Sequence, residues 1–201
     1  MVNLTRIYTR TGDDGTTSLG DMSRTGKNDP RLKAYADVDE GNSAIGVVVA
    51  MRELPEDIAE LLVRIQNDLF DVGADLCTPV VDEPRHEPLR VTQAYVDFLE
   101  HACDEHNGKL EPLRSFVLPG GTPAAAGLHV ARTVIRRAER STWAALDTYH
   151  GGMNPLTATY LNRLSDLLFI LSRLANAGAA GDVLWEPGRH GKPSAPGQAP
   201  A

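Results

Sequence analysis

The chain has 201 residues, 42% of them hydrophobic and only 5% aromatic, and 20 Lys and Arg against 27 Asp and Glu give a formal net charge of −7. This length predicts one domain with a sizeable core, and the apolar content excludes wholesale disorder. The acidic balance argues against a nucleic-acid partner, and the lack of a long apolar run argues against a membrane span. No apolar signal-peptide core lies near the N-terminus, so the cytoplasm is the expected location.

The first 29 residues are polar, rich in Gly and Thr, and outside any helical pattern. Ten consecutive residues concentrate glycines, hydroxyl groups and backbone donors: Thr9, Arg10, Thr11, Gly12, Asp13, Asp14, Gly15, Thr16, Thr17 and Ser18. Such groups can surround phosphate oxygens, and Lys27 adds a positive charge. Because the Walker A and EF-hand spacings are missing, the segment alone fits either a flexible loop or a phosphate-binding loop.

The first helix is predicted to open at Pro30 and to end at Leu54-Pro55, because proline is favoured in a first helical turn. One face carries small and apolar residues: Ala34, Val38, Gly41, Ile45 and Val48. Another face carries Tyr35, Asp39, Asn42, Ser43 and Gly46. Asp39, flanked by small residues, is a candidate to pair with an arginine across a close contact; an ordinary exposed face is the alternative.

The second helix is predicted to begin at Pro55 and to end before Thr78-Pro79, with an apolar seam at heptad spacing. Its members are Ile58, Leu62, Ile65, Leu69, Val72 and Leu76. A proline-rich loop at 78–89 precedes a weaker helical pattern of Val91, Tyr95, Phe98 and Ala102. Residues 56–105 hold thirteen acidic residues against three arginines, a net charge of −10.

The fourth helix is predicted to start at Pro123 with Thr122 as its N-cap. Its seam consists largely of small residues, which let neighbouring helices approach closely: Leu128, Ala131, Ile135, Ala138, Thr142 and Ala145. Phe116 precedes the glycine-rich turn that leads into this helix. A phenylalanine in this position is ordinarily a plug in the core.

Arg132, Arg136 and Arg140 recur every fourth residue beside that seam. Like charges at this spacing repel each other, so the stripe needs neutralisation. A polyphosphate gripped by the guanidinium groups would supply it, and so would acidic side chains of the protein. The candidate acidic partners are Glu139, Asp39 and Asp166.

The fifth helix carries the seam Leu161, Leu164, Leu168, Leu171 and Ala175. Asn162 and Asp166 lie one turn apart beside it. No convincing strand alternation occurs, so residues 1–186 are predicted to form one all-α domain, a helical bundle preceded by the N-terminal loop at about 9–29. Residues 187–201 are rich in Pro, Gly and Ala and are predicted to be disordered.

Five short segments in order carry a family resemblance. They are YTRTGDDG (8–15), VDEGNS (38–43), FVLPGG (116–121), RRAER (136–140) and YLNRLSD (160–166). Each is weak alone, but together, across residues 7 to about 186, they closely resemble the PduO-type ATP:cob(I)alamin adenosyltransferases. Gly41 departs from the family pattern, which usually has Leu there, at about 1 kcal/mol of helix propensity.

The resemblance implies a five-helix bundle assembled as a homotrimer, with ATP and cobalamin bound at subunit interfaces and Mg²⁺ as the accompanying ion. It implies that residues 9–18 and Lys27 wrap the nucleotide. From a neighbouring subunit, ATP would be contacted by Arg136, Arg137, Glu139, Arg140 and Asn162. Arg132 would pair with Asp39 across the interface, and Phe116 would occupy the lower face of the corrin and displace dimethylbenzimidazole.

The implied reaction moves the 5′-deoxyadenosyl group of ATP to cob(I)alamin, giving adenosylcobalamin and triphosphate. Cobalt(I) is itself the nucleophile, so the protein needs only to align it with the ribose C5′ and stabilise the departing triphosphate. An electron-donating reductase and an adenosylcobalamin-dependent mutase are the expected partners. The alternatives are a non-catalytic ATP- and cobalamin-binding bundle that delivers the cofactor to a client enzyme, and a purely structural helical oligomer.

Overall fold

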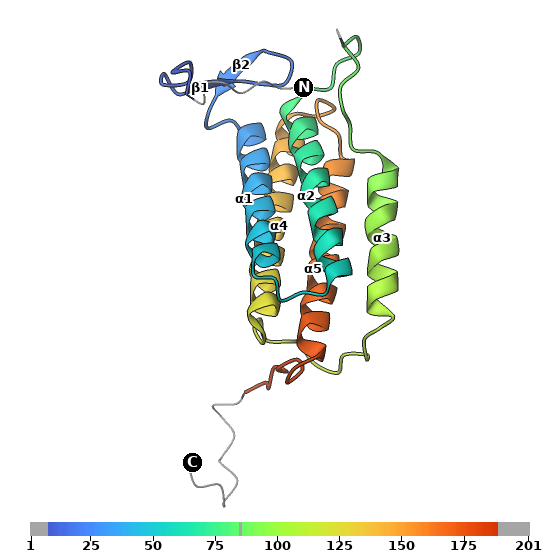
Figure 1. Ribbon diagram of the computed structural model, residues 1–201. Coiled ribbons are helices and arrows are strands. Elements are labelled where there is room, and N and C mark those ends of the chain that lie inside the picture. Colours follow the sequence, from blue (N-terminus) through green and yellow to red (C-terminus); the bar gives the residue numbers. More distant parts are fainter. Residues whose placement is uncertain (1–7, 85, 189–201) are drawn as a thin grey trace, which may run out of the picture.

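The computed structural model describes residues 8–84 and 86–188. Five helices lie side by side along a common direction (Figure 1): α1 (Pro30–Ala50), α2 (Glu56–Cys77), α3 (Gln93–Asn107), α4 (Pro123–Thr148) and α5 (Leu156–Ala177). The all-α five-helix prediction is therefore confirmed. The tail predicted at 187–201 lies outside the described residues except for Pro187 and Gly188.

A small hairpin was not predicted. Strand β1 (Thr16–Ser18) pairs antiparallel with β2 (Arg24–Gly26) within the N-terminal arm. Its three-residue strands are too short to produce an alternating pattern in the sequence. The hairpin lies at the end of the bundle where α1 begins (Figure 1).

The predicted seams form the core. All six seam residues of α2 are buried, as are those of α4 and the leucines of α5. Gly41 accounts for the close approach of α1 and α4, because a Cβ there would lie 2.5 Å from Cδ1 of Ile135. The departure from the family pattern at Gly41 is therefore a packing feature.

The pattern predicted for α3 is confirmed in part, because Val91 and Ala102 are buried in the core. Val91 precedes the helix, and the buried face is Val96, Leu99, Ala102 and His106. Tyr95 and Phe98 are only half-buried, because the Tyr95 hydroxyl donates to Asp71 and Arg64 lies over the Phe98 ring. Aromatic side chains with polar partners sit at the edge of a core, where they weaken a periodicity signal.

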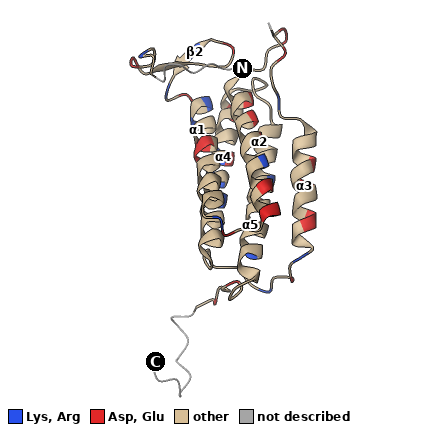
Figure 2. Cartoon of the chain, in the orientation of Figure 1, with Lys and Arg blue, Asp and Glu red and all other residues tan. Residues whose placement is uncertain are grey.

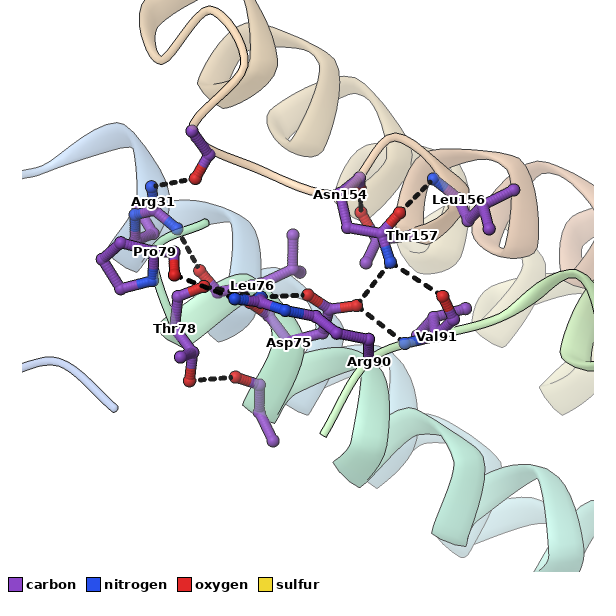
Figure 3. Close-up of polar contacts among 12 residues, drawn as sticks. Arg31, Asp75, Leu76, Thr78, Pro79, Arg90, Val91, Asn154, Leu156 and Thr157 are labelled. Atoms are coloured by element: carbon purple, nitrogen blue, oxygen red, sulfur yellow. Dashed lines mark hydrogen bonds and ion pairs between the residues drawn. The ribbon is translucent and has the colours of Figure 1, made fainter. Parts of the chain in front are cut away.

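The carboxyl end of α2 is joined to two loops through Asp75, whose side chain is fully buried (Figure 3). One carboxylate oxygen accepts from Nη1 of Arg90 at 2.6 Å. The other accepts from the amide of Val91 and from Nδ2 of Asn154, both at 2.7 Å. This buried carboxylate therefore fixes the loop before α3 and the loop before α5 at one end of the bundle.

The N-terminal arm is attached to the same end. The amide of Gly20 donates to the carbonyl of Cys77 at 2.9 Å. The buried Arg31 donates to the carbonyl of Leu76 at 2.9 Å and to that of Gly152 at 3.0 Å. These contacts satisfy carbonyls left open at the end of α2 and hold the arm against the bundle.

None of the helices in residues 8–84 and 86–188 combines the length and apolar character that a membrane crossing requires. Acidic side chains gather on α2 and α3 (Figure 2), which are the helices of the −10 stretch.

Candidate functional site

The N-terminal loop is held in a compact form by its own polar groups. Asp14 accepts from the amide of Thr16 at 3.0 Å and from its hydroxyl at 2.7 Å, and these bonds lower the pKa of the Asp14 carboxyl. Arg24, which the sequence did not single out, donates to the carbonyl of Thr11 at 2.7 Å and to the Thr16 hydroxyl. Arg10 and Gly15 both have positive φ, so the chain turns sharply at each end of the loop.

Lys27 lies against this loop. A Cβ on Gly12 would lie 3.1 Å from Nζ of Lys27, so glycine permits the close approach. Lys27 and Thr17 also line a pocket of about 270 Å³ with Leu32, Tyr35 and Ala36. The loop, the lysine and the first turns of α1 thus share one surface.

The arginine stripe runs along α4. Arg136 and Arg140 are exposed, and neither forms a salt bridge within the described part of the chain. Arg132 is half-buried, and its Nε is buried without a partner among the described residues. Burial, and then the neighbouring Arg136, lowers the pKa of Arg132. Because a buried cationic group without a hydrogen-bond acceptor is unfavourable, Arg132 calls for an acceptor from outside the described chain.

Arg137 differs from the stripe. It forms ion pairs with Asp37 at 3.5 Å and with Glu40. One residue corresponds to about 100° around a helix, so Arg137 faces α1 whereas Arg136 does not. Two of the acidic partners considered from the sequence do not pair with the stripe in the described chain: Glu139 accepts from Asn162, and Asp166 pairs with Arg163.

A second pocket, of about 290 Å³, lies where α1 begins and α4 ends. Its lining includes three cationic side chains, Lys33, Arg137 and Arg140, together with Ser141. The Ser141 hydroxyl donates to Asp37 at 2.5 Å. A concentration of positive charge in a small hollow suits an anionic ligand.

Two pairs of residues predicted at the site have different contacts within the chain. Glu139 and Asn162 meet across α4 and α5, with Nδ2 of Asn162 donating at 2.9 Å. Asp39 is exposed on α1 and does not pair with Arg132 within the chain. The predicted contact between those two residues lies between subunits, which a single chain does not test.

Phe116 is not a core plug, since its side chain is 76% exposed. Its ring lies 6.0 Å from that of Trp185, centroid to centroid. The sequence analysis missed Trp185, although it is one of only two tryptophans in the chain and follows the last helix. Both rings lie at the end of the bundle where α4 begins.

The N-terminal loop lies at the end of the bundle where α1 begins (Figure 1), whereas Phe116 precedes the start of α4 at the opposite end. With a rise of 1.5 Å per residue, Arg140 lies roughly 26 Å along the axis from Pro123. The arginine stripe, from Arg132 to Arg140, covers roughly 12 Å of this distance. No group of three or more His, Cys, Asp or Glu side chains able to hold a metal ion occurs among residues 8–84 and 86–188.

The described residues thus form an antiparallel helical bundle with a stripe of cationic side chains along α4. The family model for cobalamin adenosyltransferases matches residues 7–175. The chain is 63% identical over 187 residues to the corrinoid adenosyltransferase of Mycobacterium tuberculosis, covering 93% of this chain and 96% of that protein. It is 46% identical to the cobalamin adenosyltransferase of Cupriavidus metallidurans, covering 91% and 95%.

Among solved structures, a variant PduO-type ATP:corrinoid adenosyltransferase from Lactobacillus reuteri, complexed with cobalamin and ATP, superposes with a TM-score of 0.82. It is 36% identical, and the match covers 90% of this chain and 97% of that one. The chain belongs to the cobalamin adenosyltransferase family.

Proposed function

We propose that this protein transfers the 5′-deoxyadenosyl group of ATP to cob(I)alamin, releasing adenosylcobalamin and triphosphate. The observation that carries the proposal is the arginine stripe on α4, which has two exposed cations and one half-buried cation without an acceptor in the described chain. Membership of the family gives this anion site its chemistry. The Lactobacillus reuteri relative, complexed with both cobalamin and ATP, supports the same pair of substrates.

In the proposed reaction, cobalt(I) donates its electron pair to C5′ of the ribose. The cobalt–carbon bond forms as the C5′–O bond breaks, and triphosphate leaves with the electron pair of that bond. The protein supplies alignment and charge rather than a nucleophile. Exposed guanidinium groups on a rigid helix, such as Arg136 and Arg140, suit the charge developing on the leaving group.

The N-terminal loop is proposed to wrap the nucleotide. Residues 9–18 offer hydroxyl and amide donors, and Lys27 lies against Gly12. From the neighbouring subunit, ATP would meet Arg136, Arg140, and the Glu139–Asn162 pair. Arg137 also lines the pocket of about 290 Å³, where its ion pairs with Asp37 and Glu40 would compete with phosphate for its guanidinium group.

A homotrimer is the proposed assembly. Asp39 is exposed on α1, and Arg132 lacks an acceptor for its buried Nε. A cross-subunit contact between them would satisfy both groups. It would also bring the stripe of one subunit to the loop of another.

Mg²⁺ is proposed to accompany ATP. Magnesium usually takes one or two protein carboxylates and completes its shell with phosphate oxygens and water. Asp14 is engaged by Thr16 and Arg24, whereas the side chain of Asp13 forms no hydrogen bond in the described chain. Asp13 is therefore the carboxylate available to hold the ion, which would neutralise charge on the triphosphate.

Phe116 is proposed to lie under the corrin and displace dimethylbenzimidazole, as suits a large ring that the protein leaves exposed. An electron-donating reductase and an adenosylcobalamin-dependent mutase would act before and after this step. The cytoplasm is the proposed compartment, in keeping with ATP as substrate and with the free thiols of Cys77 and Cys103.

An anaerobic assay with ATP and freshly reduced cob(I)alamin tests the proposal. The expected products are adenosylcobalamin and inorganic triphosphate in equal amounts. Release of pyrophosphate and AMP, or no product with fresh cob(I)alamin, would contradict the assigned reaction.

The same assay separates the alternatives. A non-catalytic carrier would bind both ligands but form no more than one equivalent of product per site, whereas the proposed enzyme continues beyond it. A purely structural oligomer would show no rise in melting temperature with ATP, because only a ligand that binds the folded state stabilises it.

A further inference from the structure

A polar cluster joins the last turn of α5 to the segment that follows it. Asp182 and Arg173 form an ion pair with Nε and Oδ2 2.9 Å apart, and their side chains are only 13% and 10% exposed. Oδ1 of Asp182 accepts from Nδ2 of Asn176 at 3.2 Å. Both oxygens of this carboxylate are therefore held by donors fixed on α5.

Asn176 extends the cluster to the turn after Phe116. Its side-chain oxygen accepts from the amide of Thr122 at 3.0 Å, and its Nδ2 donates to the carbonyl of Gly120 at 3.1 Å. Gly121 has φ of +104°, and a Cβ at this position would overlap the Asn176 amide. The helix thus holds the turn and the C-terminal segment through adjacent groups.

Beyond Asp182, the C-terminal segment pairs with the chain around Phe116. The amide of Leu118 donates to the carbonyl of Val183 at 2.8 Å, and the amide of Trp185 donates to that of Phe116 at 2.7 Å. The Ser115 hydroxyl donates to the carbonyl of Trp185 at 2.8 Å. Because Phe116 is mostly exposed, these bonds hold the backbone segment that carries its ring beside Trp185.

We infer that Asp182 is a positioning residue for the adenosyl transfer: it holds residues 183–185 against residues 116–118, so that Phe116 and Trp185 present one fixed apolar edge to the corrin. The inference rests on the proposed function of Phe116. Asp182 itself touches no substrate. Both of its oxygens face donors, so in Asp182→Asn the new amide group must face either Arg173 or Asn176, donor against donor. The side chain keeps its shape and loses one anchor.

Trp185 provides a test that does not depend on activity. In a Trp143→Phe background it is the only tryptophan, since the chain has two. Asp182→Asn is expected to shift the emission of Trp185 to longer wavelength and to increase its quenching by acrylamide roughly twofold. The reason is that Trp185, 46% exposed in the wild-type structure, becomes free to move into solvent. The control is Glu105→Gln, which alters an exposed pair with Lys109 at the same end of the bundle and should change neither signal.

A second test uses the protein with both native tryptophans. Asp182→Asn is expected to slow the reaction that starts from cob(II)alamin with a reductant roughly tenfold, the loss typical of a charged hydrogen bond. The rate with pre-reduced cob(I)alamin should change less than about twofold, because removal of the lower ligand matters for the reduction. Ser115→Ala, a milder change that leaves the cluster intact, should act in the same direction by a smaller factor.

Unchanged Trp185 fluorescence in Asp182→Asn would overturn the inference, and so would equal losses from both cobalamin states. A fluorescence change without any selective loss would also overturn it, because the segment would then move without consequence for Phe116. Failure of the proposed function is distinguishable: in that case wild-type protein forms no adenosylcobalamin, while the fluorescence of Trp185 still reports whether Asp182 holds the segment.

Discussion

Asp75→Ala removes the carboxylate that joins three parts of the chain at one end of the bundle. The side chain is fully buried and accepts three hydrogen bonds, of 2.6, 2.7 and 2.7 Å. Alanine leaves the Arg90 guanidinium, the backbone amide of Val91 and the side-chain amide of Asn154 without that acceptor. Breaking a buried ion pair by removing one partner costs about 3–5 kcal/mol. For a chain of this size the melting temperature should fall by roughly 6–20 °C.

The assay is thermal and urea unfolding followed by circular dichroism, with the free energy of unfolding taken from the urea midpoint and slope. Glu105→Ala is the matched control, since it removes a carboxylate from an exposed pair and should cost less than about 1 kcal/mol. A melting temperature for Asp75→Ala within about 2 °C of wild type would refute the reasoning, because it would mean that other groups satisfy the three donors.

Three further predictions concern the proposed site and its surroundings. Arg136→Ala should lower kcat/KM roughly 10- to 100-fold in the cob(I)alamin assay without changing the melting temperature, because the side chain is exposed and its proposed role is to contact phosphate. The same change at the exposed Arg114 should leave turnover intact. Phe116→Ala should impair the reaction from cob(II)alamin far more than the reaction from cob(I)alamin. The control Phe70→Ala, which removes a ring 72% exposed on α2, should affect neither reaction. Equal loss of rate from the two cobalamin states in Phe116→Ala would contradict the lower-face role. His129 is 2% exposed with neither ring nitrogen partnered in the described chain, and burial, followed by the charge of Arg132, lowers its pKa. The unfolded state then binds more protons, so the contribution of neutral His129 to stability is present above about pH 6.5 and is lost as pH falls. The melting temperature of wild type should therefore drop more between about pH 6.5 and 5 than that of His129→Phe. Parallel curves for the two proteins would exclude His129 as the cause.

The sequence by itself determined the bundle. Seams of apolar residues three and four apart identify buried helical faces through local spacing alone, and those of α2, α4 and α5 are buried as predicted. Thr122 was recognisable as an N-cap for the same local reason, and its hydroxyl accepts from the amide of Ala125. The arginine stripe on α4 was also readable, because side chains four apart share a face whatever packs beside it.

Tertiary structure alone decided the partners. Whether Arg137 meets phosphate or Asp37 depends on how α1 and α4 are rotated against each other, and no local pattern records that rotation. The local pattern around Phe116 favoured the core, yet the residue lies exposed beside Trp185, and a hydrogen bond between Ser115 and Trp185, 70 positions apart, joins the two segments. Asp75 and Asn154, 79 positions apart, meet for the same reason. Periodicity reports which face of a helix is buried, whereas contacts between loops and helix ends depend on the complete path of the chain.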